Sequence, residues 1–111
     1  MFYLCGTMTA LLCAPGCASD RRSEPVAGPL TLDAQSRRGQ QVFMKQCSQC
    51  HPGGEAGLGP AINNKPLPGF LINLQVRQGF GAMPAFSKGR VTDDELADVI
   101  AYLKALRRHG E

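Results

Sequence analysis

The chain has 111 residues, which is enough for one small domain and no more. It carries 12 Lys and Arg against 9 Asp and Glu, and no basic tract has interleaved aromatic residues, so nucleic acid is not an expected partner. A domain this small buries a marginal core and is often helped by a metal or a cofactor.

Residues 1–17 resemble an export signal, because they contain no charged side chain and many small or apolar ones. The stretch "APGCASD" also resembles a bacterial lipoprotein cleavage site, in which Cys17 becomes the lipidated first residue. Ordinary signal cleavage near Ala18, without a lipid, is the alternative. We therefore expect an exported, periplasmic protein, which is anchored to the membrane surface if Cys17 is lipidated.

Residues 18–32 are predicted to be a flexible linker, since the segment is polar and contains Pro25, Gly28 and Pro29. The linker would separate the signal from a domain at residues 33–109. In a lipidated protein, a coil of this length would hold that domain just off the membrane.

A first helix is expected to begin near Thr31 or Asp33, either of which can cap it, and to run through the second cysteine of "CSQC". Pro52 restricts the residue before it, so we expect this helix to end at His51. Gly39 and Phe43 are four residues apart and share a face, and a glycine in mid-helix indicates close approach of another helix.

Residues 52–69 are rich in Gly and Pro and are expected to form a loop. A short helix is predicted at roughly 69–78, with Pro68 at its first position and Gly79 at its end. The stretch "GFGAMPAFSKGR" again has the composition of a loop.

The last helix has the clearest signals. Thr92 can be its N-cap and Glu95 completes a capping box, with Val91 and Leu96 placed for a hydrophobic staple. Gly110 is the expected end. Its apolar residues recur at helical spacing and predict one buried stripe: Leu96, Val99, Ile100, Leu103 and Leu106. No segment alternates as a strand does, so the fold class is all-α.

The stretch "CSQCH" carries the strongest chemical signal. Cys47, Cys50 and His51 have the C-x-x-C-H spacing of a c-type haem attachment site. A structural zinc site would need four ligands, usually with a second Cys or His pair, which this sequence does not offer. A thioredoxin-like thiol pair would accompany a βαβ pattern, and no strand pattern is present. A structural disulfide stays open, but it would leave the histidine unexplained.

Two later stretches have both a plain and a functional interpretation. "GLGP", which includes Gly59 and Pro60, is a turn by composition, but such a loop could supply a carbonyl that orients His51. Met83 in "GAMPAF" could fill a gap in the core. It is also a candidate sixth ligand, because it follows His51 by 32 positions in a loop held extended by Pro84.

These motifs together resemble the class I cytochromes c, and the resemblance covers about residues 33–108. It implies a small cytochrome c-like fold, in which the N- and C-terminal helices cross around one haem c bound covalently through Cys47 and Cys50. It also implies His51 and Met83 as iron ligands, with Gly59 and Pro60 beside the haem. By that likeness, Gly39 and Phe43 cross the last helix at Tyr102 and Leu103.

The resemblance implies an electron carrier and not an enzyme. We expect a monomer with a redox donor and a redox acceptor as partners. One alternative is a dedicated electron-accepting subunit of a dehydrogenase. Another is a haem gas sensor or peroxidase, which would require Met83 to be absent or labile. Apolar residues expected to line the haem pocket are Leu58, Ile62, Leu71, Leu74, Val76, Phe80 and Phe86.

Overall fold

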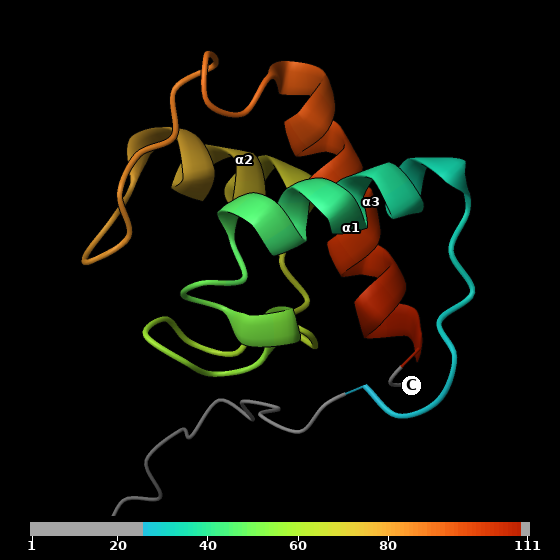
Figure 1. Ribbon diagram of the computed structural model, residues 1–111. Coiled ribbons are helices and arrows are strands. Elements are labelled where there is room, and N and C mark those ends of the chain that lie inside the picture. Colours follow the sequence, from blue (N-terminus) through green and yellow to red (C-terminus); the bar gives the residue numbers. More distant parts are fainter. Residues whose placement is uncertain (1–25, 110–111) are drawn as a thin grey trace, which may run out of the picture.

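A computed structural model describes residues 26–109 of the chain (Figure 1). Three α-helices and one short 3₁₀ helix make up the regular structure: α1 (Ala34–Gln46), η1 (Pro52–Gly54), α2 (Gly69–Gln78) and α3 (Asp93–His109). Strands are absent from this part of the chain, which agrees with the predicted all-α class. The expected signal, the lipidation site at Cys17 and the stop at Gly110 lie outside the described residues.

Helix α1 begins where the sequence predicts and ends earlier. The Asp33 carboxylate caps the helix by accepting the Ser36 backbone N–H at 2.7 Å, which lowers the pKa of that aspartate. The helix was predicted to reach Cys50 but ends at Gln46, so that prediction is wrong by four residues.

The early end of α1 has a local cause. The Phe43 carbonyl accepts both the Cys47 N–H at 2.8 Å and the Ser48 N–H at 2.9 Å, so the next carbonyls lose the regular i→i−4 pairing. One more turn follows, in which the His51 N–H donates to the Cys47 carbonyl at 2.9 Å. The two cysteines therefore lie in a turn after the helix instead of in its last turn.

Helix α2 has the predicted bounds. Pro68 was expected at the first helical position, but it is the N-cap, and Gly69 is the first helical residue. Gly79 ends it with a φ of 65°, a left-handed conformation that glycine adopts without steric cost. None of the residues of α2 is buried, although several are apolar.

Helix α3 starts with the predicted capping box. The Thr92 N–H donates to the Glu95 carboxylate at 2.8 Å, and the Glu95 N–H donates to the Thr92 hydroxyl at 3.2 Å. Val91 and Leu96, the expected staple pair, are both buried in one apolar cluster.

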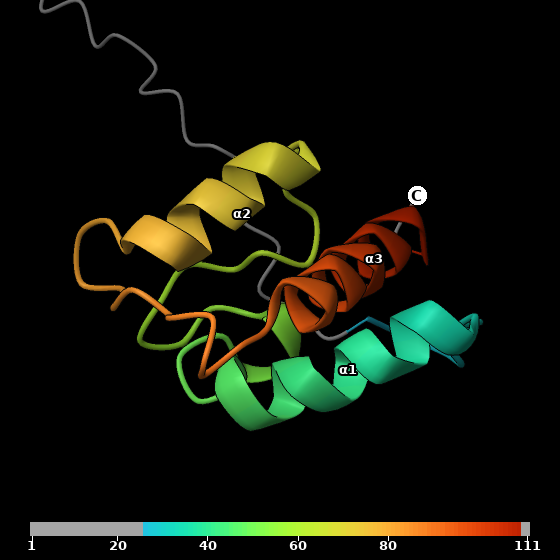
Figure 2. The same ribbon diagram turned by 90° about the horizontal axis from the view of Figure 1, so that it is seen from above.

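Helices α1 and α3 cross and form the main core, as the two views show (Figures 1 and 2). Phe43 meets Tyr102 with 5.4 Å between ring centroids, as predicted. Gly39 instead meets the backbone of Asp98 and Val99, one turn before the predicted partners, because the helices cross at an angle. Any side chain at position 39 would overlap the α3 backbone.

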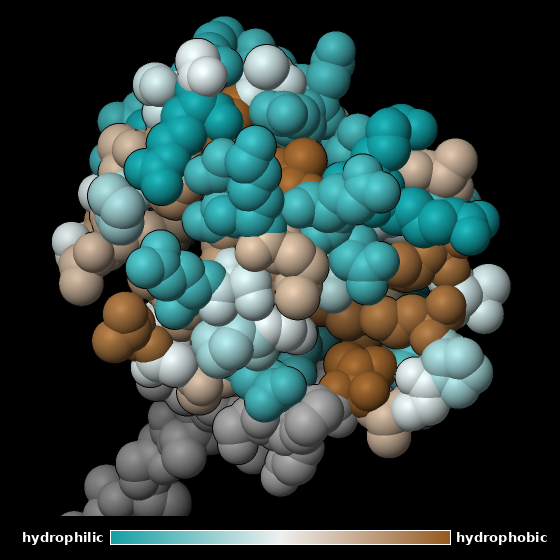
Figure 3. Space-filling model, in the orientation of Figure 1, coloured by the Kyte–Doolittle hydropathy of each residue, from teal (hydrophilic) through white to brown (hydrophobic). Residues whose placement is uncertain are grey.

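The segment at residues 26–32 lies along the end of α3. Val26, Leu30 and Leu32 pack against the α1–α3 core, and His109 Nε2 donates to the Ala27 carbonyl at 2.6 Å. The face in Figure 3 is mostly hydrophilic, with hydrophobic atoms at the lower right where this segment runs. Part of the predicted linker is thus packed against the core. Among residues 26–109, no helix has the length and hydrophobicity needed to cross a membrane.

Candidate functional site

Cys47 and Cys50 follow α1 directly and are half-buried free thiols that no disulfide joins. Cys47 packs against the core cluster that contains Phe43, and this burial raises the pKa of its thiol to about 11. The thiol is therefore protonated at neutral pH. Reactive thiols are commonly found where the pKa is lowered, so the burial of Cys47 does not favour a redox-active thiol pair.

His51 is buried, and one side of its ring is already committed. Its Nδ1 lies 2.8 Å from the Pro60 carbonyl oxygen, the contact expected from "GLGP". A carbonyl only accepts hydrogen bonds, so Nδ1 carries a proton, and in the neutral imidazole Nε2 therefore keeps its lone pair. This is the arrangement in which a protein presents a histidine to a metal.

Gly59 lies against the face of the His51 ring. A Cβ at this position would come within 2.9 Å of both ring nitrogens and would also overlap the carbon between them. The Gly59 N–H donates to the Cys50 carbonyl at 2.9 Å, which ties the loop back to the second cysteine. The cysteine motif and the "GLGP" loop thus form one unit around the imidazole.

The loop that carries this unit has more internal structure than its composition predicts. The Gly54 N–H donates to the His51 carbonyl at 2.9 Å and closes η1. The Gly54 carbonyl then accepts the N–H groups of Ile62 and Asn63 at 2.7 and 3.0 Å. Helix η1 was not predicted from the sequence, because a Gly- and Pro-rich segment gives no periodic signal.

Met83 is half-buried in the loop between α2 and α3, where it packs against the cluster of Phe86, Val91 and Leu96. Its sulfur accepts a hydrogen bond from Gln75 Nε2 at 3.5 Å, and the same amide donates to the Phe80 carbonyl at 3.3 Å. Gln75 was not predicted as a site residue, because no sequence pattern marks a polar residue on a short helix as a partner of this sulfur.

The predicted pocket residues divide into two groups. Phe86 is buried beside Met83, and Ile62 and Val76 are partly buried against the two core clusters. The other four are exposed to solvent: Leu58, Leu71, Leu74 and Phe80. Phe70 on α2 is also 70% exposed. Covering apolar side chains of this size with a bound group is favourable, because it removes apolar surface from water.

The donors and the uncovered apolar side chains together fit a covalently bound haem. Two thiols, an imidazole with a free Nε2 and a thioether sulfur are the groups that attach and ligate haem c. The loops that carry them lie on the same side of the molecule in both views (Figures 1 and 2). Among residues 26–109, no three His, Cys, Asp or Glu side chains are grouped so as to hold a metal ion, and this includes Cys47, Cys50 and His51. A four-ligand zinc site therefore gains no support in this part of the chain.

Comparison with known proteins points the same way. Residues 34–103 match a family model described as "Cytochrome C oxidase, cbb3-type, subunit III". The cytochrome c subunit of 4-cresol dehydrogenase (hydroxylating) from Pseudomonas putida is 40% identical over 80 residues, which are 72% of this chain and 70% of that protein.

Cytochromes c6 are also similar to the chain. The protein from Synechocystis sp. is 33% identical over 68% of this chain and 69% of its own length. The protein from Bryopsis maxima is 37% identical over 59% of this chain and 84% of its own length. No solved structure matches the chain significantly.

Proposed function

The chain belongs to the class I c-type cytochromes and transfers electrons through one haem c attached at Cys47 and Cys50, and on this premise we propose which residues control the iron. His51, through Nε2, and Met83, through its sulfur, would hold the iron. With both positions filled, the protein is a carrier and not an enzyme.

The hydrogen bond between His51 Nδ1 and the Pro60 carbonyl carries this proposal. It fixes the tautomer of the imidazole and leaves Nε2 as the only ring nitrogen able to bind a metal. Gly59 supports the same orientation because it packs on the ring without a side chain. The two contacts together hold the histidine in the orientation of a metal ligand.

Haem c, when bound, supplies an iron that alternates between the ferrous and ferric states. The protein sets which state is favoured. A neutral sulfur from Met83 and apolar surroundings stabilise the ferrous form and raise the potential. Gln75 adds to this effect, because its amide donates to the sulfur and reduces the electron density that the sulfur gives to the metal.

The axial ligands are tested with two methionine variants of the haem-loaded protein. Met83→Ala should abolish the sulfur-to-iron charge-transfer band of the ferric protein and allow the reduced protein to bind carbon monoxide rapidly. Met44→Ala is the matched control, because Met44 is an exposed methionine on α1. An unchanged spectrum for Met83→Ala would rule out Met83 as a ligand. Rapid carbon monoxide binding by the unmodified protein would instead favour a gas sensor or peroxidase.

Export to the periplasm and lipidation of Cys17 are part of the proposal, and they rest on the sequence of residues 1–18. Cys17→Ser should release the protein from the membrane fraction, and mass spectrometry of the mature chain reports the lipid directly. Unaltered fractionation of the variant would exclude the anchor.

A second candidate is a dedicated subunit that accepts electrons from one dehydrogenase, and the similarity to the 4-cresol dehydrogenase cytochrome subunit favours it. A free monomeric carrier would dissociate from its donor and acceptor as salt rises, because screening weakens surface charge contacts. Copurification with one dehydrogenase at high salt would support the subunit. Elution alone, as a monomer, would support the free carrier.

A further inference from the structure

Beyond the ligands themselves, we propose that Arg77 is the positioning residue that keeps the Met83 loop closed on the iron. This inference rests on the proposed function, because it takes Met83 as the sixth ligand. Arg77 lies in the last turn of α2, six residues before Met83, and was predicted by no sequence motif.

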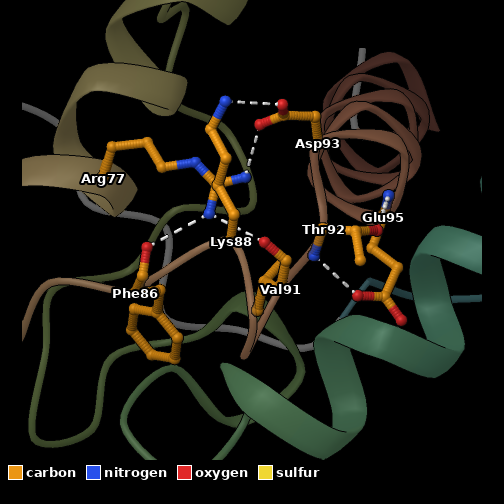
Figure 4. A network of polar contacts seen from close by, with 7 residues as sticks. All are labelled: Arg77, Phe86, Lys88, Val91, Thr92, Asp93 and Glu95. Carbon is orange, nitrogen blue, oxygen red and sulfur yellow. Dashed lines mark hydrogen bonds and ion pairs between the residues drawn. The ribbon is translucent and has the colours of Figure 1, made fainter.

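Arg77 makes three hydrogen bonds to the chain that follows Met83 (Figure 4). Its Nη1 donates to the Phe86 carbonyl at 3.1 Å and to the Val91 carbonyl at 2.7 Å. Its Nη2 donates to the Asp93 carboxylate at 2.9 Å. One guanidinium thereby joins the end of α2 to the end of the Met83 loop and to the start of α3.

Besides Arg77, few groups attach the loop to α2. The neutral Gln75 amide donates to the Met83 sulfur at 3.5 Å and to the Phe80 carbonyl at 3.3 Å. The loop leaves the helix at Gly79, whose Cα lies so close to the chain at Pro84 and Ala85 that a Cβ would overlap it. It returns where the Phe86 N–H donates to the Val76 carbonyl at 2.8 Å. Met83 lies between these two points, so the position of its sulfur depends on how firmly the returning chain is held.

Of the contacts that attach the Met83 loop to α2, the hydrogen bonds of Arg77 are the strongest. The side chain of Arg77 is only 14% exposed, and Phe86 and Val91 are both buried. Hydrogen bonds from a charged donor are stronger than neutral ones, and water cannot easily replace the donor at buried carbonyls. Lys88 pairs with the same carboxylate at 2.9 Å, but its side chain is 73% exposed and contacts no loop carbonyl in Figure 4.

Loss of Arg77 should therefore let Met83 leave the iron more readily. The test measures the affinity of added imidazole for the ferric holoprotein, because imidazole competes with the Met83 sulfur. Arg77→Met removes the donors and keeps the apolar stem, and Lys88→Met is the matched control that breaks only the exposed ion pair. We expect imidazole to bind about tenfold more tightly to Arg77→Met and about as in the wild type to Lys88→Met.

The same substitution in the Met83→Ala background separates a positioning role from general destabilisation. With no sulfur to displace, Arg77→Met should change the imidazole affinity by less than about twofold. The inference would be overturned if Arg77→Met changed the imidazole affinity of the otherwise wild-type protein by less than about threefold. It would also be overturned if the affinity changed equally with and without Met83→Ala. If Arg77→Met fails to fold with haem, Arg77→Lys is the second variant. It keeps the charge but loses the several N–H donors of the guanidinium, and it should shift the imidazole affinity in the same direction.

The proposed function fails in a different way. If the wild-type protein lacks the charge-transfer band, or if Met83→Ala leaves it intact, Met83 is not a ligand. If that band behaves as expected while Arg77→Met leaves imidazole binding unchanged, only the positioning role of Arg77 is wrong.

Discussion

Gly59→Ala should destabilise the protein through a single contact with the His51 ring. The added methyl group would come within 2.9 Å of both nitrogens of the His51 ring, so either the ring or the loop must move. Overpacking of this kind costs about 1–3 kcal/mol, and loss of the His51–Pro60 hydrogen bond costs about 1 kcal/mol more. The sum of about 2–4 kcal/mol is a large part of the 5–15 kcal/mol that holds a typical domain folded.

Guanidinium unfolding of the haem-loaded protein measures this loss, and Gly89→Ala is the matched control. A Cβ at position 89 would meet nothing closer than the Ser87 hydroxyl at 3.8 Å, and Gly89 has no positive φ. The control should therefore change the free energy of unfolding by less than about 1 kcal/mol. Equal unfolding midpoints for the two variants would refute the close contact between Gly59 and the His51 ring.

Three further predictions concern other parts of the domain. Gly39→Ala should cost about 1–3 kcal/mol of unfolding free energy despite the better helix propensity of alanine, since a Cβ overlaps the α3 backbone; a stabilised variant would contradict the crossing. Gln75→Leu should lower the reduction potential by roughly 20–60 mV, because the Met83 sulfur loses a hydrogen bond; an unchanged potential in voltammetry would contradict that contact. The pKa of Asp93 is lowered by its bonds to Lys88 and to the α2 guanidinium, so its stabilising effect is present above the ordinary pKa of 3.8 and is lost as the pH falls below it. In Asp93→Asn, the free energy of unfolding should no longer show this loss as the pH falls, which unfolding measured at several pH values would report.

The helix boundaries that could be predicted are those set by local chemistry. Thr92 and Glu95 satisfy each other's backbone groups whatever surrounds them, and Gly79 ends α2 by its own left-handed conformation. The end of α1 could not be predicted in this way. It depends on a double hydrogen bond to the Phe43 carbonyl, for which the sequence "CSQC" contains no stop signal.

In the candidate site, too, the features set by nearby residues could be predicted and those set by distant contacts could not. The spacing of Cys47, Cys50 and His51 is local, and "GLGP" is close enough in sequence for the Pro60 contact to be anticipated. The contacts of Gln75 and Arg77 arise only when the loop folds back on α2, and neither residue has a distinguishing pattern. The packing of residues 26–32 on α3 was missed for a related reason, because their proline and glycine content is typical of linkers.

In the proposed site, the Met83 sulfur and His51 both bind the iron. This ligation can be tested by nuclear magnetic resonance of the ferrous holoprotein, labelled with ¹³C at the methionine methyl groups. We predict one methyl resonance shifted far upfield by the porphyrin ring current, present in Met44→Ala and absent in Met83→Ala. If every methionine methyl resonates in the ordinary range, or if the shifted signal persists in Met83→Ala, the claim is contradicted.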